Sequence, residues 1–118
     1  MKRITRSTAR GRVVVIFVTC PTVVVARRLG RELVRRQLAA CVNQLPAIES
    51  TFQWKGKLER CREVLLLIKT TAARAEQLRK AITTLHPYDV PEVIALPIVA
   101  GHAPYLEWVR QSVAPRSA

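Results

Sequence analysis

The alternation of apolar and polar positions predicts one long β-hairpin over residues 38–71, and the other elements are arranged around it. Residues 48–54 alternate strictly, as in a strand with two different faces. Residues 54–57 form the expected turn, because Gly56 accepts a positive φ without steric cost. Residues 64–68 are continuously apolar, as in a strand covered on both faces. Each arm therefore has a core half and a surface-like outer half.

The length of this hairpin is large for the chain. An arm of about 14 residues spans about 46 Å at roughly 3.3 Å per residue, whereas a compact domain of this size has a radius of gyration of only about 13 Å. The outer half, with Phe52 and Trp54, therefore projects beyond its own core. We expect another copy of the chain to cover these rings, since closed homo-oligomers are the usual solution. The alternative is a bent hairpin that folds back on its own domain.

The remaining elements follow the same periodicities. We expect a strand over 13–18, a helix from the N-cap Thr22 to about Gln37, a second helix capped by Thr70-Thr71 and ending at Leu85, a strand over 93–99 and a last helix over 104–113. This β-α-β-β-α-β order predicts an α+β, ferredoxin-like domain with an antiparallel sheet and two helices on one face. The helix-free face of the sheet is a second reason to expect self-association.

Two local features refine this picture. Pro46 has no N–H, so it marks an edge, a bulge or a break in the first arm of the hairpin. The first helix has an expected inner stripe of Ala26, Leu29, Leu33 and Val34. Its outer face holds Arg27, Arg28, Arg31, Arg35 and Arg36, which we interpret as a solvated surface.

Length and composition indicate a single domain over residues 13–113, preceded by a flexible basic arm (1–12) and followed by a frayed end (114–118). No apolar run approaches the roughly 18 residues of a membrane-spanning helix, so no membrane association is expected. Three cysteines without regular spacing do not form a disulfide framework. A reducing cytoplasm is the expected location.

The formal charge of +12, from 20 basic and 8 acidic residues, suits polyanions. However, the excess is mostly arginine spread over both ends and two helices, and only 5% of residues are aromatic. The chain is therefore not expected to bind a specific nucleic acid. It has two histidines, no nucleophile elbow and no glycine-rich phosphate loop, so it is not expected to be an enzyme.

Several motifs in order resemble the CutA family of divalent-cation tolerance proteins, over roughly residues 13–113. They are Leu38–Asn43, Trp54–Lys57, Ile68–Thr71, His86–Tyr88 with Pro91-Glu92, and Tyr105–Trp108. The resemblance implies a homotrimer in which the sheets pack together and the long hairpins join the edges of neighbouring sheets. It also implies a link to metal tolerance, because some members bind copper or other divalent cations.

Cys41 and His86 match positions for which metal ligation has been proposed in the family. Thiolate suits Cu(I), and imidazole suits copper or zinc, so weakly bound copper or another divalent cation is the expected cofactor. Two further family ligands are missing, because Val18 and Ile82 stand at those positions. Cys20, two residues after Val18, would share its side of the strand if the strand extends that far.

Other interpretations of these residues stay open. Cys41 is also typical of a small buried hydrophobe, and His86 could satisfy the carbonyls at a helix end. Cys61, among charged residues, is expected to be an exposed free thiol.

A second group of family positions predicts a small-ligand cleft at a subunit boundary. It consists of Lys69, Tyr88, Glu63 and Glu92, with Trp54 as a wall. A small anion or metabolite would suit it, as in the similar PII signalling trimers, and the protein would then be a regulatory or scaffold trimer. The alternative is that Lys69 only pairs with a carboxylate at an interface.

Overall fold

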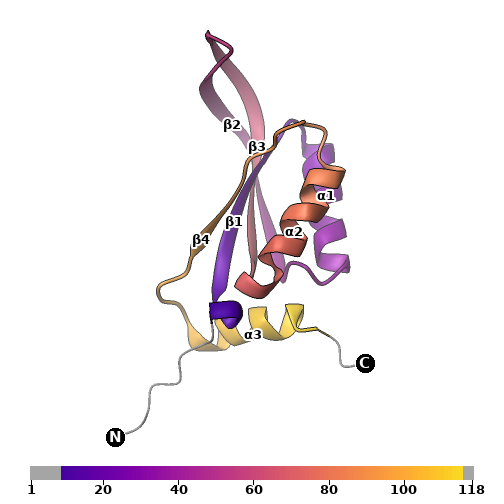
Figure 1. The fold of residues 1–118 in the computed structure, drawn as a ribbon, viewed down its shortest axis with the longest axis vertical. Helices are drawn as coiled ribbons and strands as arrows, with labels where there is room; N and C mark the ends of the chain where they lie inside the picture. Colours follow the sequence, from indigo (N-terminus) through magenta and orange to yellow (C-terminus); the bar gives the residue numbers. More distant parts are fainter. Residues whose placement is uncertain (1–8, 116–118) are drawn as a thin grey trace, which may run out of the picture.

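The computed structural model describes residues 9–115. Its elements are the 3₁₀ helix η1 (Ala9–Gly11), β1 (Val13–Cys20), α1 (Val23–Arg35), β2 (Cys41–Trp54), β3 (Lys57–Thr71), α2 (Ala72–Leu85), β4 (Val93–Pro97) and α3 (Ala103–Val113). The strands form one antiparallel sheet in the order β2-β3-β1-β4. Helices α1 and α2 lie together beside this sheet (Figure 1). The predicted ferredoxin-like α+β arrangement, with a further C-terminal helix, is confirmed.

Local sequence signals account for the helix ends. The Thr22 hydroxyl accepts the N–H of Val25 at 3.1 Å, which confirms it as the N-cap of α1. Thr71 occupies the N-cap position of α2 without a side-chain cap bond. Thr70 instead donates its hydroxyl to the Leu38 carbonyl at 2.6 Å. Helix α1 ends at Arg35, two residues before the expected end, because Gln37 adopts a left-handed φ of 60°.

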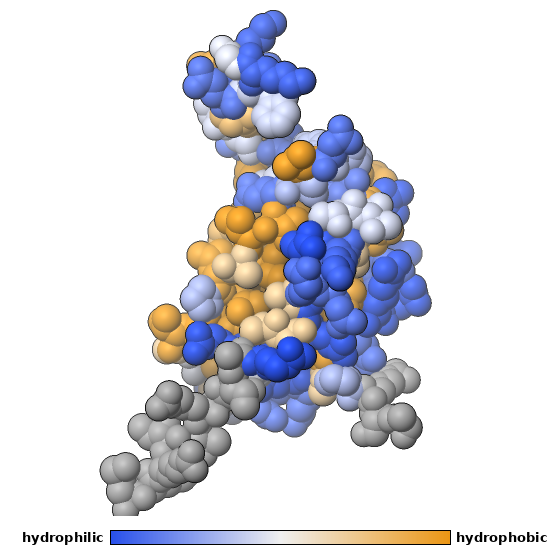
Figure 2. All heavy atoms as spheres, viewed as in Figure 1, coloured by the Kyte–Doolittle hydropathy of each residue, from blue (hydrophilic) through white to orange (hydrophobic). Residues whose placement is uncertain are grey.

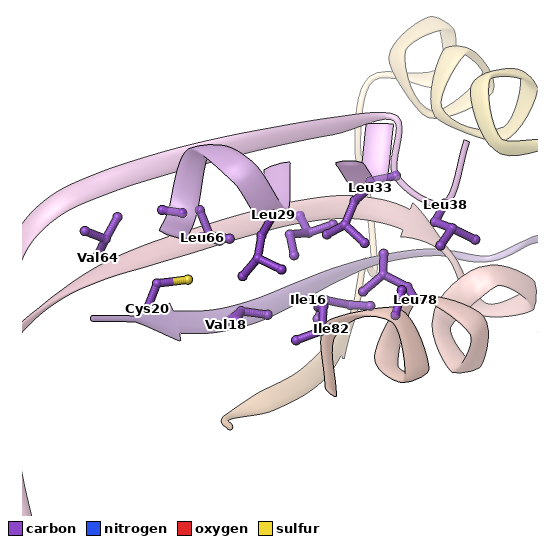
Figure 3. Close-up of a cluster of buried hydrophobic side chains, with 14 of the residues drawn as sticks. Ile16, Val18, Cys20, Leu29, Leu33, Leu38, Val64, Leu66, Leu78 and Ile82 are labelled. Atoms are coloured by element: carbon purple, nitrogen blue, oxygen red, sulfur yellow. The ribbon is translucent and has the colours of Figure 1, made fainter. Parts of the chain in front are cut away.

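The core lies between the two helices and the sheet (Figure 3). Its fully buried side chains come from every layer, and they include Ile16, Val18, Leu29, Leu33, Leu66, Ile68, Leu78 and Ile82. Val34 was expected in the inner stripe of α1, but it is 43% exposed. It follows Leu33 directly, so it turns toward the side of the helix rather than toward the sheet.

The hairpin runs from the pair Cys41↔Lys69 to the pair Trp54↔Lys57. Its register shifts between Leu45 and Ile48, so the irregularity predicted at Pro46 is confirmed as a bulge. Lys55 and Gly56 both have positive φ, 51° and 79°, as in a type I′ turn.

The outer part of the hairpin projects away from the helices (Figure 1). Phe52 and Trp54 there are 43% and 55% exposed. The alternative of a hairpin folded back on its own domain is therefore wrong. The chain extends over 57 × 33 × 22 Å, and its radius of gyration is 15.9 Å.

The face of the sheet opposite α1 and α2 is mostly apolar and is covered by neither of these helices, and we call it the open face. The strand registers place two rows of side chains there: Asn43, Leu67, Phe17 and Ile94 in one, and Cys41, Lys69, Val15 and Leu96 in the next. Figure 2 shows apolar residues gathered where β1 and β4 lie. Ile94 and Leu96 are 51% and 42% exposed.

The N-terminal end of the domain packs more tightly than expected. Residues 9–11 form η1, and the carbonyl of Gly11 accepts the Nε–H of Arg110 at 3.0 Å. The carbonyl of Arg12 accepts the N–H of Ala72 at 2.8 Å. The expected flexible arm over 1–12 therefore does not include residues 9–12, and residues 1–8 lie outside the described part, as do 116–118 of the expected frayed end.

None of the helices within residues 9–115 is long and apolar enough to cross a membrane.

Candidate functional site

Cys41 lies at the first pair of the β2–β3 ladder, directly opposite Lys69. Its thiol is half-buried and points toward the Asn43 side-chain oxygen, with 3.8 Å between sulfur and oxygen. Tyr105 of α3 lies near Cys41. Burial, and then the Cys41 thiol, raise the pKa of the Tyr105 hydroxyl. Cys41 and Lys69 therefore share one corner of the open face.

His86 lies at the C-cap of α2 and is only 6% exposed. Its Nδ1 accepts the N–H of Tyr88 at 3.1 Å, so its Nε2 carries the proton and donates to the Thr19 carbonyl at 2.8 Å. The ring thus joins the end of α2 to β1, rather than to the carbonyls of its own helix end. Both ring nitrogens are occupied by the backbone.

The structure does not bring Cys41 and His86 together within one chain. Cys41 pairs with Lys69 on β3, whereas Thr19, the partner of His86, pairs with Leu65. These two β3 positions are four residues apart, which is about 13 Å along a strand. Within residues 9–115 there is no group of three or more histidine, cysteine or acidic side chains that could hold a metal ion. A shared metal site would therefore need more than one copy of the chain.

The other two cysteines lie apart from Cys41. Strand β1 does extend to Cys20, and this thiol lies with Val18 in the core (Figure 3). Burial, and then the nearby Glu63 carboxylate, raise its pKa to about 11, so Cys20 is a protonated core residue at neutral pH. Cys61 is half-buried rather than exposed as expected, because it lies within the paired part of the outer hairpin.

A hollow of about 650 Å³ lies between the outer hairpin and the segment after α2. Four residues of the predicted cleft line it: Trp54, Glu63, Tyr88 and Glu92. Glu63 is 7% exposed and accepts the Tyr88 hydroxyl at 2.9 Å. Burial and this contact raise the pKa of Tyr88 well above its usual value. We call this hollow the acidic hollow.

The fifth predicted member, Lys69, does not line the acidic hollow. Lys69 is on the same side of β3 as Glu63, but six residues separate them, which is about 20 Å. It could join the hollow only from another copy. Sequence reasoning missed Asp89, Ser50 and Phe52, which also line the hollow. Within the described part of the chain, the lining includes three carboxylates and no lysine or arginine, which favours a cation over the expected anion.

Residues 14–112 match the family described as CutA1 divalent ion tolerance protein. The chain belongs to this family. The match covers β1 to α3, so it includes Cys41, His86 and the acidic hollow. It confirms the resemblance inferred from the sequence motifs.

Three members of the CutA1 family show how similar this chain is to known proteins. The human Protein CutA is 50% identical over 101 residues, which are 86% of this chain and 56% of the relative. The divalent-cation tolerance protein CutA of Thermus thermophilus is 43% identical over 98 residues, 83% of this chain and 95% of the relative. The crystal structure of CutA1 from Oryza sativa has a TM-score of 0.87 at 40% identity, covering 92% of this chain and all of that one. The chain thus spans little more than half the length of the human relative and nearly all of the bacterial one.

Proposed function

We propose that this protein is a homotrimer that binds copper or another divalent cation and takes part in the response to metal ions. The observation that supports the assembly is the open face. Its apolar surface extends to β4, where Ile94 and Leu96 are about half-exposed. Continuous apolar surfaces of this kind are typical of protein interfaces. The exposed rings of Phe52 and Trp54 on the projecting hairpin support the same conclusion.

The proposed metal site is centred on Cys41. Its half-buried thiol lies on the open face, so an interface formed there would bring cysteines of several copies to the same surface. Thiolate sulfur is the ligand that soft Cu(I) prefers. His86 would have to release Thr19 or Tyr88 before binding a metal, so we assign it the weaker part in the site.

Copper titration by calorimetry, under reducing conditions and with a Cys41→Ser variant, tests this site. We expect the variant to lose at least about tenfold in copper affinity, because a hydroxyl replaces the soft ligand. A Cys61→Ser variant is the matched control, since it removes the other half-buried thiol. An unchanged titration for Cys41→Ser, or an equal loss in both variants, would show that copper binds elsewhere.

The acidic hollow supports a second candidate function, the binding of a small ligand by a regulatory or scaffold trimer. Glu63 is a buried carboxylate, and the hydrogen bond that it accepts from Tyr88 comes from a neutral group. Aromatic faces and carboxylates together suit an organic cation such as an amine. We expect spermidine to raise the melting temperature of the protein and Glu63→Gln to remove at least half of this shift. A shift of the same size in both proteins would rule out the hollow.

We further propose that the protein binds its ligands without catalysis and is cytoplasmic. The odd number of cysteines favours a reducing compartment. The absence of turnover is testable in the same calorimeter, since a catalysed reaction would give continued heat after each addition of ligand.

A further inference from the structure

A second hollow, of about 470 Å³, lies between α1 and the edge strand β2. We call it the arginine hollow, because Arg27, Arg31 and Arg35 form its rim. Gln44 adds a side-chain amide, and Gly30 and Val42 contribute to its apolar floor. No carboxylate of residues 9–115 lines it. It is therefore the opposite of the acidic hollow in charge and lies on a different part of the molecule.

The three arginines are spaced as a ladder. They occur at every fourth residue of α1, so they lie on one stripe of the helix, with about 6 Å of rise between neighbours and about 12 Å over the whole ladder. Each guanidinium presents a planar fork of N–H donors, which matches the oxygens of a phosphate group. An anion with several charges along a chain fits this spacing better than a single small ion.

The ladder also has uncompensated charge. Glu32, the nearest acid on α1, accepts hydrogen bonds from Arg35 and from Arg36, the latter at 2.8 Å. Arg27 and Arg31 pair with no acid within residues 9–115. Two neighbouring guanidinium groups therefore face one hollow without a counter-charge, and a bound anion would supply it.

Gly30 brings α1 close to the edge strand β2 at the arginine hollow. Gly30 has no side chain, and a Cβ atom placed there would lie 3.3 Å from Cγ1 of Val42. The helix therefore lies close to β2, and the Val42 side chain fills the space beside Gly30 between them. Strand β2 is at the edge of the sheet, so its outer backbone groups are not used by another strand within residues 9–115.

We propose that the arginine hollow binds an oligophosphate chain, either free polyphosphate or the phosphate tail of a nucleotide. The forks of Arg27 and Arg31 hold successive phosphate groups, and Arg35 extends the contact while it keeps its bond to Glu32. Orthophosphate, which reaches fewer of these groups, binds more weakly than the chain. Val42 and Gln44 lie on the helix side of β2, whereas Cys41 lies on the side of the open face.

Calorimetric titration with inorganic tripolyphosphate at fixed, moderate salt, without added metal, tests the proposal. We expect an Arg27→Gln/Arg31→Gln variant to bind at least about tenfold more weakly than the unmodified protein. The matched control is Arg28→Gln/Lys80→Gln, which removes the same charge from exposed helical positions outside the hollow. The control variant is expected to change the affinity for tripolyphosphate less than about threefold, because it alters only the overall electrostatic field of the protein.

The remaining arms distinguish the source of the phosphates. Equal affinity for tripolyphosphate and ATP indicates recognition of the chain alone, whereas tighter binding of ATP indicates that the base contacts the apolar floor. Equal weakening in the two double variants would overturn the proposal in favour of nonspecific attraction to a basic protein. Undetectable binding of tripolyphosphate, or binding no tighter than that of orthophosphate, would also overturn it.

Discussion

Replacing Phe17 with glutamate is expected to convert the proposed trimer into a monomer of 13.3 kDa. Phe17 is on β1, an inner strand of the sheet, and lies on the open face between Leu67 on β3 and Ile94 on β4. In an interface built on this face, each introduced carboxylate would be removed from water without a partner, which costs several kcal/mol per copy. In a monomer the same carboxylate would remain solvated. The measurement is the molar mass by light scattering coupled to gel filtration.

The matched control for this variant is Val24→Glu on α1. Val24 is 72% exposed and lies on the opposite side of the sheet, so the same chemical change there should leave the trimer intact. Circular dichroism must show that both variants remain folded. A folded Phe17→Glu protein that still forms a trimer would contradict the assignment of the open face as the interface.

His86→Ala is expected to lower the free energy of unfolding by about 3–4 kcal/mol. The substitution leaves the Thr19 carbonyl and the Tyr88 N–H without their partner, and each unsatisfied buried group costs about 1–3 kcal/mol. It also leaves a cavity, because the side chain that it removes is only 6% exposed. Urea unfolding at one fixed protein concentration measures this loss, because oligomer stability depends on concentration.

His102→Ala provides the control for this prediction. His102 is the only other histidine in the sequence, it is exposed, and it makes no side-chain cap bond at the start of α3. Its replacement should change stability by less than about 0.5 kcal/mol. A similarly small effect of His86→Ala would mean that the ring is not a structural link between α2 and β1. Copper titration of the same variant shows how much of the metal site remains without the ring.

Much of the fold followed from short-range rules. Gly56 after Lys55 predicted the turn, Pro46 predicted the bulge, and Thr22 predicted the start of α1. These signals depend on a few neighbouring residues, so the sequence contains them in full. The excess length of the hairpin needed only arithmetic on the strand rise.

The candidate sites were harder to predict because they depend on contacts between distant segments. The role of His86 rests on Thr19, which is 67 residues away in the chain. The separation of Lys69 from Glu63 follows from β3 being a continuous strand, so strand counting alone shows that one chain cannot join them. The separation of Cys41 from His86 requires the register of three strands, which the amino-acid pattern does not specify.

The family resemblance grouped residues that lie apart in a single copy. Cys41 and Lys69 lie at one end of β3, whereas Glu63, Tyr88 and Glu92 lie toward the other. Positions shared by a family can be brought together by assembly as well as by the fold of one chain. The proposed metal site at Cys41 therefore depends on how the copies associate, whereas the acidic hollow is lined by one chain and would need a second copy only to add Lys69.

The most direct test of this account is the molar mass of the unmodified protein in solution, measured by light scattering over a dilution series down to the lowest detectable concentration. We predict about 40 kDa throughout, for three chains of 13.3 kDa each. A folded particle of about 13 kDa at all concentrations, with the open face exposed to water, would contradict the proposed assembly and the metal site that depends on it.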